Sequence, residues 1–123
     1  MEGEKLNAKE RGRWGEELAV EYLTGKGYKN VARGYRSRFG EVDIIVMDSE
    51  FLAFVEVKLR KNRDFAYARE YVGKEKQRKI KATAMLWLSS HETKLQPRFD
   101  VIEIYAPDEA AKPEIIHIEN AFQ

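Results

Sequence analysis

Two short stretches of the chain place charged side chains among apolar ones. One is "GEVDII", which contains Asp43, and the other is "FVEVK", which contains Glu56 and Lys58. Because successive residues of a β-strand point to opposite faces, Glu56 and Lys58 would share one face of their strand. A two-residue turn at residues 49–50 would place Asp43 directly beside Glu56 in an antiparallel hairpin. A shift of register by one residue would separate these charges, so the register that gathers them is the prediction.

Two neighbouring carboxylates repel one another unless a cation neutralises them, and the repulsion grows as water is excluded. Oxygen ligands of this kind suit Mg²⁺ or Mn²⁺, which bind a few carboxylates and keep waters that a substrate phosphate can displace. Lys58 could then stabilise charge on that phosphate or position an attacking water. An isolated Glu-x-Lys in a strand is more often a solvated surface. Here the apolar flanks, the opposing carboxylate and the basic segment that follows favour a functional site.

Capping and helical phase predict the first element that must position this site. Asn7 and Glu10 form the pattern of a capping box, which predicts a helix over residues 8–25. At about 100° per residue, Glu16 lies at the edge of the apolar stripe of that helix, whereas Glu17 points to water. Glu16 is therefore the acidic residue of this helix that can face the rest of the fold.

The remaining elements follow from periodicity. We expect a meander of three antiparallel strands over residues 28–37, 41–47 and 51–59, followed by a loop over residues 60–69. A second helix over residues 70–89 and two more strands over residues 98–105 and 114–118 complete the chain. Gln77 is the polar member of the apolar face of the second helix. The sequence therefore predicts one α/β domain over residues 1–123, with the order α-β-β-β-α-β-β.

Charge is spread unevenly along a chain whose net charge is only +1. Residues 26–38 contain five basic residues and no acidic one, residues 58–81 contain ten basic residues against three acidic ones, and residues 39–57 contain five acidic residues and no basic one. Basic segments around an acidic patch indicate a nucleic-acid surface, although a solvated charge-rich surface gives the same pattern. The residues expected to bind DNA are Arg33, Arg36, Arg38, Arg60, Lys61, Lys74, Lys76 and Arg78.

The composition also indicates in which compartment the protein is expected. It contains no Cys, which excludes a disulfide framework and a thiolate metal site. No apolar run approaches the roughly 20 residues that a membrane span requires. We therefore expect a cytoplasmic protein without a membrane partner.

Five stretches in order carry a family resemblance: "GRWGEELAVEYLTGKGY", "GYRSRFGEVDIIV", "LAFVEVKLR", "KQRKIKATAMLWL" and "RFDVI". They resemble the YraN-like family of prokaryotic proteins, which is placed in the restriction-endonuclease-like superfamily with its PD-(D/E)xK site and is similar to archaeal Holliday-junction resolvases. The resemblance implies a mixed central sheet with flanking helices, and a metal-dependent nuclease site on the second and third strands and the first helix.

The resemblance also implies roles for particular residues. Asp43 and Glu56 take the places of the acidic metal ligands, with the Val57 carbonyl as a further ligand, and Lys58 matches the motif lysine. Glu16 matches a first-helix glutamate that is both a ligand and a catalytic residue in resolvase-like members. Gln77 occupies a helix position that often carries a polar active-site residue. The sequence departs from the superfamily pattern at Val42, where a proline is common.

Three functions remain open from the sequence. The first is a Mg²⁺- or Mn²⁺-dependent endonuclease on DNA, selective for branched or junction structures because no base-reading motif is present, and working as a homodimer if both strands of a junction are cut. The second is a nucleic-acid-binding module with the nuclease fold and little activity, an accessory to DNA repair, recombination or uptake. The third is a scaffold whose carboxylates hold a structural ion.

Overall fold

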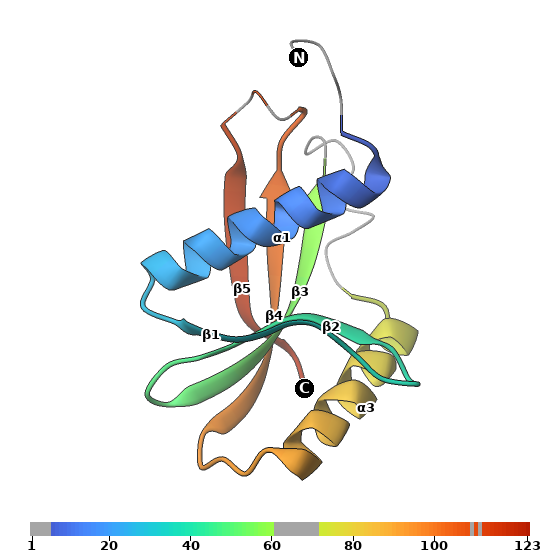
Figure 1. The fold of residues 1–123 in the computed structure, drawn as a ribbon, viewed down its shortest axis with the longest axis vertical. Coiled ribbons are helices and arrows are strands. Elements are labelled where there is room, and N and C mark those ends of the chain that lie inside the picture. Colours follow the sequence, from blue (N-terminus) through green and yellow to red (C-terminus); the bar gives the residue numbers. More distant parts are fainter. Residues whose placement is uncertain (1–5, 61–71, 109, 111) are drawn as a thin grey trace.

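The computed structural model describes residues 6–60, 72–108, 110 and 112–123 of the chain. Its elements appear in the predicted order (Figure 1): α1 (Ala8–Gly25), β1 (Lys29–Arg36), β2 (Glu41–Met47), β3 (Phe51–Arg60), α3 (Lys74–Ser90), β4 (Gln96–Tyr105) and β5 (Glu114–Phe122). The predicted mixed α/β fold with the order α-β-β-β-α-β-β is confirmed. Within the described residues, no helix is both long enough and apolar enough to cross a membrane.

The five strands form one sheet in the order β1-β2-β3-β4-β5. β3 and β4 are parallel, whereas the other neighbouring pairs are antiparallel, so the sheet is mixed. The parallel pair requires a crossover between β3 and β4, and α3 lies in that connection. The predicted meander of β1, β2 and β3 is present.

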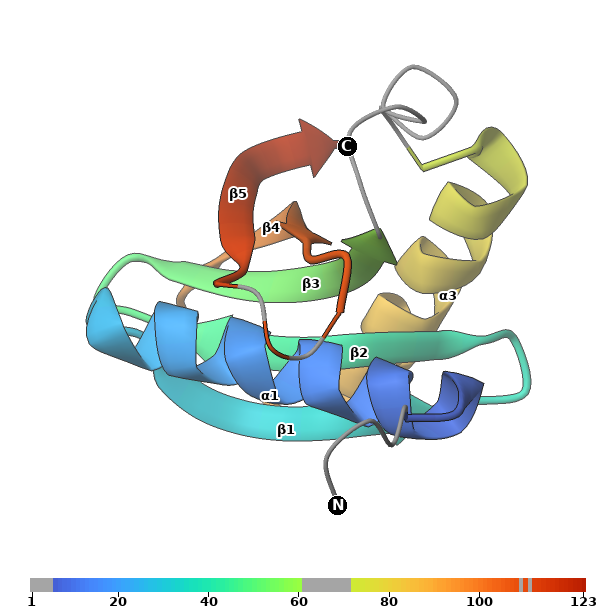
Figure 2. The same cartoon turned by 90° about the horizontal axis from the view of Figure 1, so that it is seen from above.

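α1 and α3 pack on opposite faces of the sheet (Figure 2). α1 packs through Ala19 and Leu23 on a core that includes Ile44 and Val55. α3 packs through residues that include Ile80, Ala84 and Trp87 on the other core, formed by the alternate strand residues such as Ile45 and Phe54. Alternation along β2 and β3 therefore supplies an apolar layer to each helix.

Local sequence signals account for the first helix. The Asn7 side chain accepts a hydrogen bond of 2.8 Å from the Glu10 amide, and Glu10 Oε1 accepts one of 3.0 Å from the Asn7 amide. This reciprocal capping box satisfies two of the amides that every helix start leaves without partners. After the helix, Gly27 adopts a φ of 101°, a conformation that glycine reaches without steric cost.

Three elements differ from the predicted bounds by two residues or more at one end. α3 begins at Lys74 rather than residue 70, because Gly73 is in extended conformation and its carbonyl accepts the first helical bond, from the Gln77 amide. β4 begins earlier than predicted, at Gln96, whose amide donates to the Glu50 carbonyl. β5 continues past residue 118, because the Asp100 carboxylate accepts the Asn120 amide at 3.0 Å across an irregularity in the ladder. Most of the loop predicted for residues 60–69 lies outside the described residues.

Candidate active site

The register between β2 and β3 brings Asp43 to Glu56. The ladder pairs Ile44 with Val55 and continues to Met47 with Leu52, which is the register predicted from a turn at residues 49–50. Next to the pair of Ile44 and Val55, the Asp43 side chain continues the contact between the strands: its Oδ2 atom accepts a hydrogen bond of 2.8 Å from the Val57 amide. The aspartate therefore takes the place of a backbone acceptor at the point where the ladder between the two strands ends.

Glu56 carries a carboxyl group that folding removes from water. The residue is only 8% exposed, and within the described chain its Oε1 atom has no hydrogen-bond partner. Burial, together with the neighbouring charge of Asp43, raises the pKa of Glu56 to about 7. Burial also raises the pKa of Asp43, although the hydrogen bond from the Val57 amide offsets part of that increase. Two carboxyl groups in this environment hold negative charge only at a cost, so the site favours a cation or a proton.

Lys76 is the nearest described cation to this pair. The sequence analysis did not predict this position for Lys76. Its Nζ atom lies 3.5 Å from Glu56 Oε2, so a residue predicted to bind DNA forms an ion pair inside the candidate site. The side chain of Lys76 is 51% exposed. Because an ion pair that is open to water contributes little, Lys76 can leave Glu56 at a small cost in free energy.

Glu16 approaches the acidic pair from α1. It is partly buried, and burial followed by the charges of Asp43 and Glu41 raises its pKa. Within residues 6–60, 72–108, 110 and 112–123, however, no three acidic or histidine side chains gather closely enough to hold a metal ion. Glu16 is therefore close enough to Asp43 to be affected by its charge, but it does not complete a three-ligand group with Asp43 and Glu56 in this conformation.

Lys58 and Gln77 have different surroundings. Lys58 lies on β3 close enough to Glu56 that its charge contributes to lowering the pKa of that glutamate. Gln77 points its amide to the backbone, and Nε2 donates a hydrogen bond of 2.6 Å to the Val72 carbonyl. The structure thus brings Lys58 to the acidic pair and gives Gln77 a role in holding the segment before α3.

Glu103 is an acidic neighbour that sequence reasoning missed. It pairs with Lys58 in the parallel ladder, is 2% exposed, and accepts a hydrogen bond of 3.3 Å from the Tyr105 hydroxyl. The signal was the alternation in "RFDVIEIY", which sets Glu103 on the same strand face as Phe99. Only the parallel pairing of β3 with β4 places that face beside Lys58.

The residues predicted to bind DNA are mostly at the surface, and several have acidic neighbours. Arg33 lies 3.2 Å from Glu17, and Arg36 lies 2.6 Å from Glu41. Arg78 pairs with Glu75 on α3. Such exposed pairs are weak, so phosphates could replace the carboxylates. Of the other predicted residues, Arg38 and Lys74 are exposed, Arg60 is partly buried, and Lys61 lies outside the described residues.

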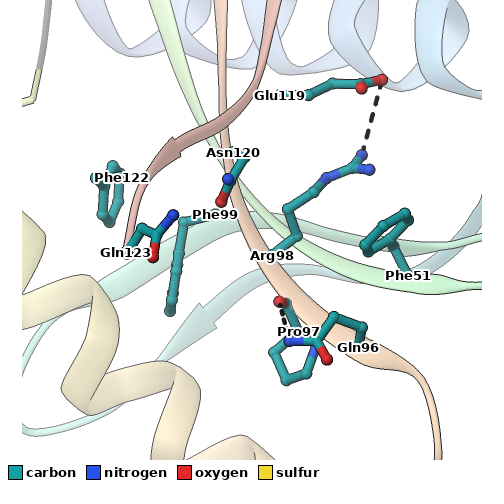
Figure 3. Close-up of a pocket in the computed structure, with 9 residues that line it drawn as sticks. All are labelled: Phe51, Gln96, Pro97, Arg98, Phe99, Glu119, Asn120, Phe122 and Gln123. Carbon is teal, nitrogen blue, oxygen red and sulfur yellow. Dashed lines mark hydrogen bonds and ion pairs between the residues drawn. The ribbon is translucent and has the colours of Figure 1, made fainter.

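One hollow among the described residues lies away from this site. It has a volume of about 650 Å³ and lies where β3 and β4 begin, with Phe51 and Arg98 in its lining (Figure 3). The Arg98 guanidinium is already held by two hydrogen bonds of 2.9 Å to Asp100 and one of 2.6 Å to the Tyr28 hydroxyl. His117 Nε2 lies within hydrogen-bond distance of the Asp100 carboxylate, at 2.8 Å. The charges of this buried network compensate one another, so the loss of one partner would leave a buried charge with poorer compensation.

Comparison with known proteins gives one family. The model of the uncharacterised protein family UPF0102 matches residues 15–104. UPF0102 proteins of Geotalea daltonii, Clostridioides difficile and Caldanaerobacter subterraneus are 44%, 42% and 39% identical to the chain. These alignments cover 99%, 95% and 96% of the chain and 97%, 100% and 98% of the relatives, in the same order. The chain therefore belongs to the uncharacterised protein family UPF0102, the YraN-like family that its motifs resemble.

Proposed function

We propose that this protein is a metal-dependent endonuclease that hydrolyses phosphodiester bonds in DNA. The observation that carries the proposal is the pair formed by Asp43 and Glu56, whose pKa values are both raised, chiefly by burial and, for Glu56, also by the charge of Asp43. Perturbed carboxyl groups beside lysines are typical of sites that bind metal ions and act on phosphates. The function would be carried out in the cytoplasm.

The residues present fit a divalent ion such as Mg²⁺ or Mn²⁺. Glu56 Oε1 is a buried oxygen without a partner among the described residues, and Asp43 keeps one carboxylate oxygen that the Val57 amide does not use. Mg²⁺ commonly binds through one or two carboxylates and retains several waters, so a third acidic ligand is not required. The Val57 carbonyl and Glu16 are the further ligands that we assign to the site. When bound, the ion would neutralise charge on the phosphate and make an attacking water more acidic.

The lysines have separate tasks in this proposal. Lys58 projects from the same strand as Glu56, two residues further on, and would donate to a non-bridging oxygen of the phosphate as its charge increases. Lys76 compensates the charge of Glu56 in the free protein, since its ammonium group lies 3.5 Å from that carboxylate. On substrate binding Lys76 would be free to move toward the DNA backbone.

The preferred substrate is DNA with a branch or an unpaired arm. Exposed basic residues lie on β1, which pairs with β2, and on α3, which brings Lys76 to Glu56. Contacts of such residues with phosphates position DNA without reading its sequence. A junction cut on both strands would need two copies of the site, which a homodimer would supply.

A cleavage assay tests the proposal. Linear, flapped and four-way-junction DNA are incubated with Mg²⁺ or Mn²⁺ and with the wild type, Asp43→Asn, Glu56→Gln, or the control Glu50→Gln, which changes an exposed acidic residue of the β2–β3 turn. We expect cutting of the branched substrates, a loss of about 100-fold or more in the two site variants, and no loss in the control. Binding by the wild type without cutting of any substrate would refute the endonuclease and favour the nucleic-acid-binding module.

A further inference from the structure

The turn between β1 and β2 presents an aromatic side chain to solvent. Phe39 is 41% exposed, and the Arg38 guanidinium lies 4.9 Å from the centre of its ring. The turn is held by Ser37, whose Oγ atom accepts hydrogen bonds from the Phe39 amide at 3.0 Å and the Gly40 amide at 3.3 Å. The exposed ring is therefore displayed from a backbone that its own hydrogen bonds fix.

The same turn is fixed against α3. The Ser37 hydroxyl lies 2.8 Å from the Thr83 hydroxyl, so the two are hydrogen-bonded. Gly40 permits this close packing, because a Cβ atom at that position would come within 3.1 Å of Lys79 Cβ. A ring on this turn cannot easily fold back onto the protein, and this rigidity lowers the entropic cost of binding a partner.

A hollow of about 430 Å³ lies between the turn and α3. Its lining combines Phe39 and Ala82 with three cationic residues and one acidic residue, namely Arg38, Arg78, Lys79 and Glu75. The size lies in the range of sites that hold small ligands or parts of larger ones. An aromatic ring among cations suits a flat base that is attached to a negatively charged backbone.

We propose that this hollow receives an unpaired nucleotide, with its base stacked on Phe39 and its phosphates beside Arg38 and Lys79. In a duplex both faces of each base are covered by its neighbours, so only an unpaired base can offer a face to the ring. The inference rests on the proposed action on DNA and assigns its substrate class: duplexes with a single-stranded arm.

The hollow is close to the acidic pair along the chain. Phe39 precedes Asp43 by four residues, which span at most about 13 Å at about 3.3 Å per residue. Stacked bases rise about 3.4 Å per nucleotide along one strand, so this distance corresponds to about four nucleotides. We therefore expect cuts within about four nucleotides of the branch point.

A binding experiment separates this inference from the proposed chemistry. Binding is measured in the Asp43→Asn background, so that DNA is not consumed, on a flapped duplex and on a plain duplex of equal length. A fluorescent base analogue at the first unpaired position reports stacking. Phe39→Ala should weaken binding of the flapped DNA by about 5- to 150-fold and leave the plain duplex nearly unchanged, whereas Phe39→Tyr should retain binding. Met85→Ala is the matched control, because Met85 is an exposed apolar residue of α3, 66% exposed, outside the hollow.

The inference would be overturned if the parent protein showed no preference for the flapped DNA, or if Phe39→Ala lost binding equally on both DNAs. Dissociation of a dimer by Phe39→Ala would also overturn it, because the ring would then be a contact between copies. A preference that depends on Phe39, together with a wild type that cuts no DNA, would support the stacking site and refute only the endonuclease. Normal cutting of flapped DNA by Phe39→Ala, with unchanged binding, would refute only the stacking site.

Discussion

Replacing Glu56 with glutamine should stabilise the metal-free protein at pH 8 and change its stability little at pH 5. Burial and the charge of Asp43 raise the pKa of Glu56 from an ordinary 4.5 to about 7. Between these two values the folded protein binds more protons than the unfolded chain, so its stability falls as the pH rises through this window. Above pH 7 the cost of holding Glu56 charged is fully present, whereas glutamine never carries it.

The magnitude follows from the same two pKa values. A rise from 4.5 to about 7, at about 1.4 kcal/mol for each pH unit, corresponds to about 3 kcal/mol. For a domain of this length that free energy amounts to roughly 10 °C in melting temperature. The attraction of Lys76 is already included in this magnitude, because the charge of Lys76 lowers the pKa of Glu56.

Urea denaturation in the presence of EDTA at pH 5 and pH 8 measures the effect for the wild type, Glu56→Gln and the control Glu50→Gln. We expect the free energy of unfolding of Glu56→Gln to exceed that of the wild type at pH 8 only, and Glu50→Gln to follow the wild type at both values. If Glu56→Gln is less stable than the wild type at pH 8, the carboxylate of Glu56 is stabilised by its surroundings and the reasoning about the site is wrong.

Three further predictions test other contacts. Mg²⁺ should raise the melting temperature of the wild type at pH 8 in a calorimetric scan, and an equal rise in Asp43→Asn would remove that residue from the ligands. Asp100→Asn should lower the free energy of unfolding in urea by about 3–5 kcal/mol, because Arg98 then loses both charged hydrogen bonds to Asp100 and keeps, among the described residues, only the longer, 3.9 Å ion pair with the half-exposed Glu119. Burial alone would raise the pKa of Asp100, yet the hydrogen bonds from His117 and Arg98 hold it below its ordinary 3.8, so this loss should be complete above pH 4 and shrink in stronger acid. Asn7→Ala should cost about 1 kcal/mol in thermal melts, since it removes the cap of α1, and Asn7→Ser should restore most of it.

The parts of the site that depend on local rules could be predicted from the sequence. A two-residue turn fixes the register of β2 on β3, and the period of two then places Asp43 beside Glu56. The same rules cannot say how far along the sheet α3 lies or how it is rotated. Lys76 was therefore assigned to DNA, although α3 brings its ammonium group to Glu56. Glu103 was missed for a related reason, because its place beside Lys58 arises from the parallel pairing of distant segments.

Helix α3 joins the two parts of the proposed DNA surface through a single face. Lys76, Lys79 and Thr83 follow one another at spacings of three and four residues, which places them on the same side of a helix. Lys76 reaches Glu56, Lys79 closely packs against Gly40 of the turn, and Thr83 bonds to Ser37 of that turn. The turn that carries the exposed ring is therefore held to α3. α3 in turn packs through Ile80 and Ala84 in the same core as Ile45 and Phe54 of β2 and β3, the strands that carry the acidic pair, so this arrangement does not depend on the ion pair of Lys76. A fixed distance between the base-stacking ring and the acidic pair would make the position of cutting depend on the branch point and not on the base sequence.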